Sequence, residues 1–331
     1  MRTLAAATFV ALGWIVPAAA GTLVPVAPVQ GSNWVEIFGI NNDNVIVGTY
    51  ADANGHDHGF TGTIAGSYTT FDYGHGTGGT EARSISDDGY ISGYVTSDGF
   101  HYLYEYLRKP NGKYDIVKND GVPLAGVAQG ITHGHTSVGE YWDDPYFTTA
   151  HGYVAKNGKM VASVDLPFET SQTKPRGINK SHVIAGYFLN SNGENEGFIQ
   201  QNGVTQVIAY PDPSAINTYV EGLNDKGVVV GSWDDGSSTY GFRLDTRTGT
   251  FTEIKVAGAR YVQIWAINDA GFATVDTDVG EFIYCPKKAQ CGTGTSAVEV
   301  VRHVKAGAFL NYTAPTKSPV VGTSITAKLR M

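Results

Sequence analysis

Charged, amide and aromatic side chains recur along this 331-residue chain at two positions in front of a branched aliphatic residue. These positions lie two and four residues before the aliphatic, and ten of the twelve side chains found there are candidates to contact a ligand. The ten are Glu36, Glu81, Arg83, Gln129, Lys174, Arg176, Tyr219, Glu221, Gln263 and Trp265. Such a mixture suits a hydroxyl-rich ligand such as a polysaccharide, because planar rings stack on sugars and arginine donates paired hydrogen bonds to uronate carboxylates.

Catalysis by the same residues is an alternative. His75 lies in the glycine-rich segment 73–79, where an imidazole could transfer protons beside Arg83 and Glu221. The enzyme would then be a uronate lyase or a hydrolase acting on polysaccharide. Two further readings stay open: the charged residues form ion pairs that only hold the fold together, or the protein is an extracellular interaction scaffold that uses the aromatic loop 142–147.

An internal repeat positions these residues. The branched aliphatics stand in tripeptides such as Gly39-Ile40-Asn41, and six copies follow one another at gaps of 45, 46, 47, 45 and 44 residues. The aliphatics are Ile40, Ile85, Ile131, Ile178, Leu223 and Ile267. Five copies carry a glycine eight positions after the branched aliphatic, and all six contain a second glycine closely followed by an aromatic residue. Four short strands per copy predict an all-β fold, a six-bladed β-propeller over residues 21–284.

The ends of the repeat predict how the ring closes. Segment 22–26 resembles the outer strand 252–256, and the sixth copy lacks a fourth strand of its own. We therefore expect segment 22–27 to complete the last blade, with the strand ending in Gly-Ile-Asn innermost. The candidate residues would then lie at one mouth of the axial funnel, where pockets of closed β folds are common.

The composite pattern resembles the HAF-type repeat family of secreted bacterial extracellular proteins. The copy nearest to that pattern is the stretch from Gly39-Ile40-Asn41 through Val47-Gly48-Thr49-Tyr50, followed by His58-Gly59-Phe60. The resemblance covers about residues 31–284. It implies a propeller and export, and it brings no catalytic residues with it.

The two ends of the chain carry different signals. Arg2, an apolar run over 4–16 and three alanines at 18–20 predict a signal peptide over residues 1–20, and hence a secreted protein, extracellular or periplasmic. The apolar run is short for a membrane span. Residues 285–331 are expected to form a small extension with strands near 296–304 and 320–329, arranged as a hairpin. Cys285 and Cys291 would form a disulfide in an oxidising compartment.

The amino-acid composition limits the kinds of binding partner that we expect. A net charge of −8 with only 16% charged residues argues against nucleic acid, which binds to basic surfaces. We expect a monomer without cofactor or metal ion. The closely spaced His133 and His135 leave zinc as a minor alternative on the face opposite the mouth.

Overall fold

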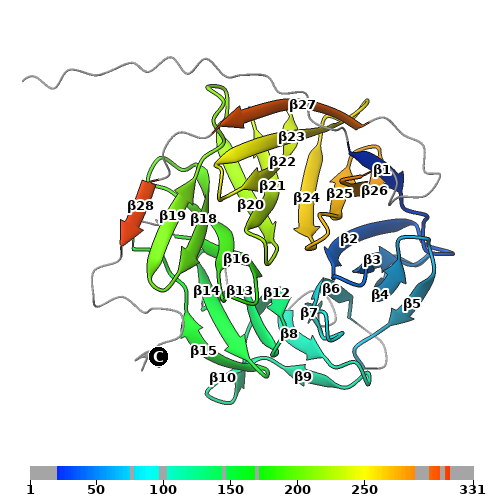
Figure 1. Cartoon of the computed structure of the whole chain (residues 1–331). Coiled ribbons are helices and arrows are strands. Elements are labelled where there is room, and N and C mark those ends of the chain that lie inside the picture. The colour runs from blue at the N-terminus through cyan, green and yellow to red at the C-terminus, as the bar shows by residue number, and fades with distance from the viewer. Residues whose placement is uncertain are drawn as a thin grey trace, which may run out of the picture.

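The computed structural model of the chain describes residues 21–74, 78–96, 103–143, 147–167, 171–287, 298–305 and 310–313. These residues form six sheets arranged as a ring around a central axis (Figure 1). They contain strands, turns and loops, and no helix. The predicted six-bladed β-propeller is confirmed.

Blades 1 to 3 each begin with an innermost strand and continue outward. Blade 1 contains β2 (Trp34–Ile40), β3 (Val45–Ala51), β4 (Asp57–Thr63) and β5 (Tyr68–Phe71). Blade 2 contains β6 (Thr80–Ile85), β7 (Ile91–Thr96), β8 (Leu103–Arg108) and β9 (Tyr114–Ile116). Blade 3 contains β12 (Gly126–Thr132), β13 (Thr136–Trp142), β14 (Ala150–Lys156) and β15 (Lys159–Ser163), with β10 (Lys118–Asn119) and β11 (Val122–Pro123) at its outer edge.

Blades 4 to 6 follow the same plan. Blade 4 contains β16 (Thr173–Ile178), β17 (Ile184–Leu189), β18 (Asn195–Gln201) and β19 (Val204–Ile208). Blade 5 contains β20 (Asn217–Leu223), β21 (Val228–Asp234), β22 (Thr239–Asp245) and β23 (Thr250–Val256). Blade 6 contains β24 (Val262–Ile267), β25 (Ala273–Thr277), β26 (Gly280–Cys285) and β1 (Thr22–Pro25).

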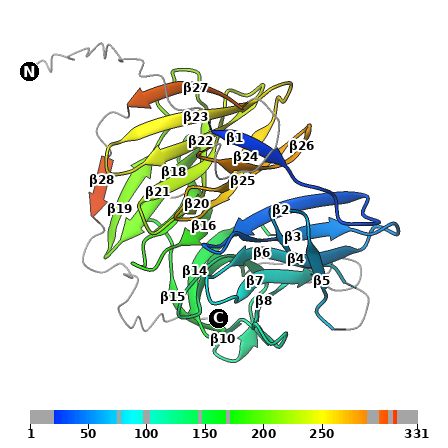
Figure 2. The ribbon, with the colours of Figure 1, turned by 45° about the vertical axis from the view of Figure 1, so that its right-hand side comes forward.

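The N-terminal strand closes the ring as predicted. β1 runs antiparallel to β26, with Thr22 opposite Cys285 and Pro25 opposite Phe282 (Figure 2). Leu23 is only 1% exposed and belongs to the apolar core shared by blades 5 and 6. The first and last segments of the propeller are therefore joined by both hydrogen bonds and apolar packing.

The two described C-terminal strands pair with two different blades and not with each other. β27 (Val298–Lys305) pairs with β23 on the outer edge of blade 5, and β28 (Leu310–Thr313) pairs with β19 on the outer edge of blade 4 (Figure 2). A strand was expected near 296–304, and that part of the prediction is confirmed. The second predicted strand, 320–329, lies outside the described residues, so the hairpin stays a prediction. β27 and β28 each satisfy the unpaired backbone groups of a different blade edge. The segments 1–20 and 320–329 and the residues His75 and Cys291 lie outside the described residues, so the predicted signal peptide and disulfide stay predictions.

The glycine that stands eight positions after the branched aliphatic in blades 1 to 5 is required by close packing of the backbone. A Cβ atom on Gly48 would lie 2.0 Å from the carbonyl oxygen of Glu36, and one on Gly231 would lie 1.9 Å from that of Tyr219. No side chain fits at such distances, because real Cβ contacts exceed 3 Å. In blades 1 to 5 the glycine thus allows the innermost strand to approach the second strand closely, whereas blade 6 has Val275 at this position.

The asparagine of the tripeptide joins one blade to the next. Asn224 Nδ2 donates to the carbonyl of Asn268 at 3.0 Å, and Asn268 Nδ2 donates to the carbonyl of Asn41 at 3.0 Å. Equivalent bonds are made by Asn41 and Asn179. Blades 2 and 3 have Ser86 and Thr132 at this position, whose shorter side chains carry no amide to donate in this way.

Candidate functional site

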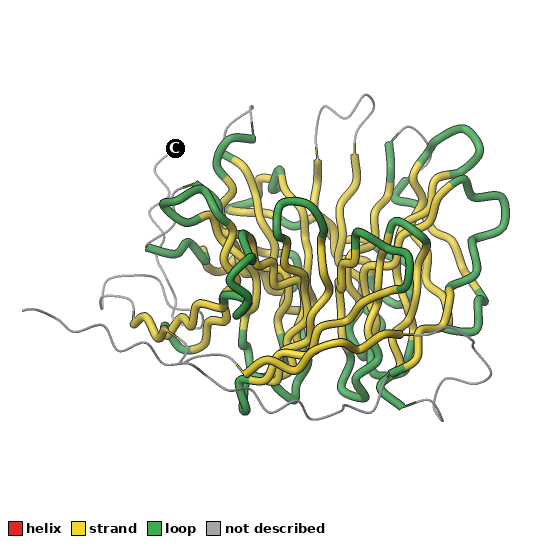
Figure 3. The backbone as a smooth tube through the Cα atoms, turned by 90° about the horizontal axis from the view of Figure 1, so that it is seen from above, coloured by secondary structure: helices red, strands yellow, loops and turns green. Residues whose placement is uncertain are grey.

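The innermost strands surround a channel of about 110 Å³ along the axis of the ring. We call the face at which these strands begin the upper face and the face at which they end the lower face; loops lie at both (Figure 3). Three layers of side chains, each with one residue per blade, line the channel. The plug layer, toward the upper face, is Phe38, Arg83, Gln129, Arg176, Glu221 and Trp265. The aliphatic layer is the six branched residues Ile40, Ile85, Ile131, Ile178, Leu223 and Ile267, and the lower ring is Asn42, Asp87, His133, Lys180, Asp225 and Asp269.

A β-bulge in every innermost strand places the plug layer. In blade 1 the register shifts between Ile37 and Gly39, so that Phe38 is the extra residue. The same shift brackets the plug residue in each other blade. Bulges commonly redirect a side chain, and here one repeated irregularity brings six different side chains to one level of the axis.

One half of the plug is a buried network of charges. The Arg176 guanidinium lies 3.4 Å from Glu140 Oε1 and 3.3 Å from Glu221 Oε2, so it pairs with carboxylates of the blades on either side. Gln129 Nε2 donates to Glu140 at 3.2 Å, and Gln263 Nε2 donates to Glu221 at 2.9 Å. Burial raises the pKa of Glu221, whereas Arg176 and then Arg83 lower it. The inter-blade ion pairs considered from the sequence are therefore present in this half.

The other half of the plug is aromatic. The guanidinium of Arg83 lies 3.8 Å from the centre of the Phe38 ring and 5.7 Å from that of Trp265. Phe38 and Trp265 contact each other edge to face at 5.4 Å. Glu81 Oε2 lies 3.8 Å from the same guanidinium. Arg83 is thus held by cation–π contacts and one carboxylate.

Three carboxyl groups meet at the seam between blades 6 and 1. Burial, followed by the charge of Asp276, raises the pKa of Glu36 to about 7. The same two causes raise the pKa of Glu281 to about 10, and burial also raises that of Asp276. Protonated carboxyls at neutral pH are hydrogen-bond donors as well as acceptors. This cluster can therefore exchange hydrogen bonds with an uncharged partner.

Tyrosines and a lysine complete the upper end of the axis. Tyr219 is half-buried, contacts the edge of Tyr187 at 5.1 Å and accepts a 3.4 Å hydrogen bond from Asn195 Nδ2. Lys174 Nζ lies 5.8 Å from the centre of the Tyr187 ring. Burial, and then the charge of Arg176, lowers the pKa of Lys174. These residues lie on blades 4 and 5, whereas the carboxyl cluster lies on blades 6 and 1.

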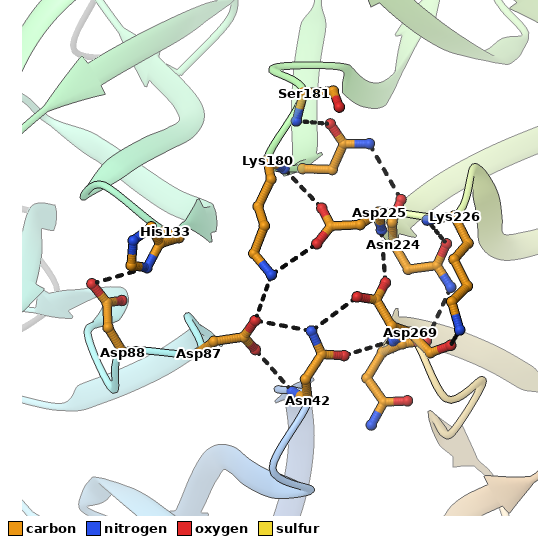
Figure 4. Close-up of polar contacts among 12 residues, drawn as sticks. Asn42, Asp87, Asp88, His133, Lys180, Ser181, Asn224, Asp225, Lys226 and Asp269 are labelled. Carbon is orange, nitrogen blue, oxygen red and sulfur yellow. Dashed lines mark hydrogen bonds and ion pairs between the residues drawn. The ribbon is translucent and has the colours of Figure 1, made fainter.

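Five of the six residues of the lower ring form a closed circuit of polar contacts (Figure 4). Lys180 Nζ donates to Asp87 at 2.9 Å and to Asp225 at 3.1 Å. Asn42 bonds both Asp87 and Asp269, and the amide of Asp225 donates to Asp269 at 2.9 Å. His133 is outside this circuit and faces Asp88 of the neighbouring turn at 3.5 Å, as does His135 at 3.2 Å. Across the described ranges no group of three or more His, Cys, Asp and Glu side chains is arranged to hold a metal ion.

The structure brings most of the sequence-derived candidates together. Arg83, Gln129, Arg176, Glu221 and Trp265 share the plug layer. Glu36, Glu81, Lys174, Tyr219 and Gln263, two positions earlier on the same strands, interact electrostatically or by hydrogen bonds with that layer or its neighbours. The suggested catalytic pair Arg83 and Glu221 interact electrostatically, while His75 is outside the described residues.

Sequence reasoning missed the partners of the plug. Glu140 and Tyr187 follow the repeated glycine directly and stand eleven residues after Gln129 and Arg176, which they contact. Tyr94 stands in the same relation to Arg83, at 5.7 Å. The sequence signal that could have identified these partners is their position directly after the repeated glycine.

The described part of the chain has no helix long and apolar enough to cross a membrane. No family model matches the sequence, and no curated protein matches it. Similar solved structures include a streptogramin B lyase, with 11% identity over 80% of this chain and 97% of that chain and a TM-score of 0.45. A catalytically inactive virginiamycin B lyase from Staphylococcus aureus with quinupristin matches with 11% identity over 80% and 98% of the two chains and a TM-score of 0.45. The WD40 β-propeller domain of Doa1 matches with 9% identity over 81% and 98%, with a TM-score of 0.32. Similarities this low transfer neither a ligand nor an activity.

Proposed function

We propose that this chain is a secreted propeller of HAF-type repeats that binds a carbohydrate at the upper face, around the axis. The observation that carries the proposal is the half-buried set Glu36, Glu81, Lys174 and Tyr219, which lies next to the plug layer on four different blades. The channel beneath is about 110 Å³, well below the roughly 300–1,000 Å³ of ordinary ligand pockets. A polysaccharide would therefore bind across the upper end of the axis rather than inside it.

The contacts of the plug favour binding over catalysis. Glu221 interacts with Arg176 and Gln263, and Arg83 is stacked on Phe38 and paired with Glu81. Side chains that already neutralise one another form a rigid floor. The groups left to meet a ligand are then the half-buried side chains of Glu36, Lys174 and Tyr219, which we call the rim. They combine hydrogen-bonding groups with the face of a tyrosine.

The rim chemistry suits a sugar polymer that carries carboxylates. The ring of Tyr219 offers a stacking surface, and Lys174 offers a cation on the neighbouring blade. Glu36, which a pKa of about 7 leaves partly protonated at neutral pH, can donate to and accept from hydroxyl groups. A chain with uronate and neutral residues would contact both sides of the rim.

Affinity electrophoresis of the secreted protein in gels containing neutral or uronate polysaccharides tests this function. We expect Tyr219→Ala to weaken retention about fivefold, since an aromatic contact contributes on the order of 1 kcal/mol, and Tyr219→Phe to retain most of it. Tyr90→Ala is the matched control, because Tyr90 is also half-buried but stacks on His135 in a lower-face turn. The proposal fails if no polysaccharide retards the protein, or if Tyr219→Ala and Tyr90→Ala behave alike. Mass spectrometry of the same incubations decides against pure binding if new oligosaccharides form.

A further inference from the structure

A second and larger hollow lies on the lower face between blades 4 and 5. This inter-blade groove has a volume of about 390 Å³. Its walls are the end of β18, the turn into β19, and the strands and turns of blade 5 that face them. Its floor is aliphatic, with Val183, Ile199, Leu223 and Val229, and its rim carries the amides of Gln201 and Gln206.

The lining of the groove is uncharged: five of its residues are aliphatic and six carry amide or hydroxyl groups. Val204, on its rim, is 39% exposed. None of the twelve residues that line it is charged. An exposed aliphatic groove of this kind favours an apolar occupant.

The path of the chain shows which occupant is nearest. β28 runs antiparallel to β19, with Leu310 opposite Val207 and Thr313 opposite Val204. The chain therefore leaves β28 beside a residue that lines the groove. Residues 314–331 follow, and Val320 is seven residues beyond Thr313, within about 23 Å along an extended chain.

The composition of segment 314–331 matches this surface. It contains the apolar residues Val320, Val321, Ile325 and Leu329, together with three basic residues and no acidic one. The lower ring next to the groove has three aspartates, Asp87, Asp225 and Asp269, and one lysine. The segment thus offers aliphatic side chains to the groove and positive charge to the acidic face.

We propose that the inter-blade groove binds residues 314–331 of the same chain, with Val320 and Val321 against its aliphatic floor. β27 and β28 already lie on the edges of blades 5 and 4, and the docked segment extends this attachment to the lower face. The C-terminal part of the chain then acts as a strap that ties blades 4 and 5 together.

A disulfide cross-link in the full-length protein tests the placement. Val204→Cys combined with Val321→Cys is oxidised at low protein concentration, and the linked peptides are identified by mass spectrometry. Val161→Cys with Val321→Cys is the matched control, because Val161 is 46% exposed on β15 of blade 3. We expect at least five times more intramolecular link with Val204→Cys. Equal linkage in both pairs overturns the proposal, and so does a link found only between two molecules, which would mean exchange between copies.

A pair of opposite charges tests the same contact without cysteines. Gln206→Lys places a cation at the groove rim and Gln206→Glu an anion of similar size. We expect trypsin to cleave after Lys317 and Lys328 about ten times faster in Gln206→Lys than in the unaltered protein, with no acceleration in Gln206→Glu. Identical cleavage in all three proteins, at the rate of a free peptide of residues 314–331, means that the groove is open to another ligand and refutes the proposal.

Discussion

Replacing Arg176 by methionine tests whether the charges of the plug layer stabilise the fold or are free to bind a ligand. The side chain is 10% exposed and lies between Glu140 and Glu221, each 4% exposed and on different blades. Methionine keeps much of the volume and removes the cation, which leaves two buried carboxylates without their partner. Breaking a buried ion pair in this way typically costs about 3–5 kcal/mol. We expect the free energy of unfolding at pH 7 to fall by about that amount.

Guanidinium denaturation followed by tryptophan fluorescence measures this change. Burial already raises the pKa of Glu221, and loss of the arginine raises it further. The destabilisation by Arg176→Met is therefore expected to shrink at pH 5, where the carboxyls take up protons more readily. The triple variant Arg176→Met/Glu140→Gln/Glu221→Gln, which leaves no unpaired charge, is expected within about 2 kcal/mol of the unaltered protein. A single variant within 1 kcal/mol of the unaltered protein, or a triple variant no more stable than the single, refutes the reasoning.

Three further predictions concern the seam and the joints of the ring. The pKa of the Glu36 carboxyl is about 7 in the folded state and about 4.5 in the unfolded state, so between these values the folded state binds one more proton. The free energy of unfolding should therefore fall by about 3 kcal/mol as the pH rises from 4.5 past 7. Glu36→Gln should remove this pH dependence in urea titrations. Asn224→Ala should cost about 1–3 kcal/mol of unfolding free energy, because it removes the bond to the next blade and two bonds within its own turn, whereas Ser86→Ala at the equivalent position should cost less. Leu23→Ala should lower stability by about 2–5 kcal/mol, and the less buried Val24→Ala by less, if β1 closes the ring as described; equal effects would argue against it.

The spacing of the branched aliphatics was sufficient to predict the number of blades and the innermost strand, and the likeness of segments 22–26 and 252–256 predicted the closing strand. These features depend on a period and on two similar segments, both of which are visible in one dimension. The turn glycines are equally local: Gly89, Gly227 and Gly271 have φ values of 79°, 75° and 88°, which their position after an aspartate-containing turn predicts. Local chemistry and periodicity thus account for the frame of the propeller.

Features that depend on pairing register could not be predicted in the same way. A bulge adds one residue to a strand, and since it recurs in every blade it leaves the repeat length unchanged. The pairing register is what brings Glu140 next to Gln129, eleven residues earlier on the neighbouring strand, where the two side chains form a hydrogen bond. The edges with which β27 and β28 pair are likewise non-local, because the other blades also end in an outer strand that could accept them.

The layers of the axis divide according to whether a six-fold ring allows the same residue at every blade. The hydrogen bond from one blade to the next can be made by the same residue type in every blade, and asparagine makes it in four of them. A plug on the axis cannot be built from six equal charges, since they would repel one another. In one half of the plug layer Arg176 therefore lies beside Glu221 and amide side chains. In the other half Arg83 lies beside aromatic rings. The rim above inherits this asymmetry, with carboxyls over blades 6 and 1 and Lys174 and Tyr219 over blades 4 and 5. A ligand bound across the axis would consequently have one orientation, because its two ends meet different chemistry.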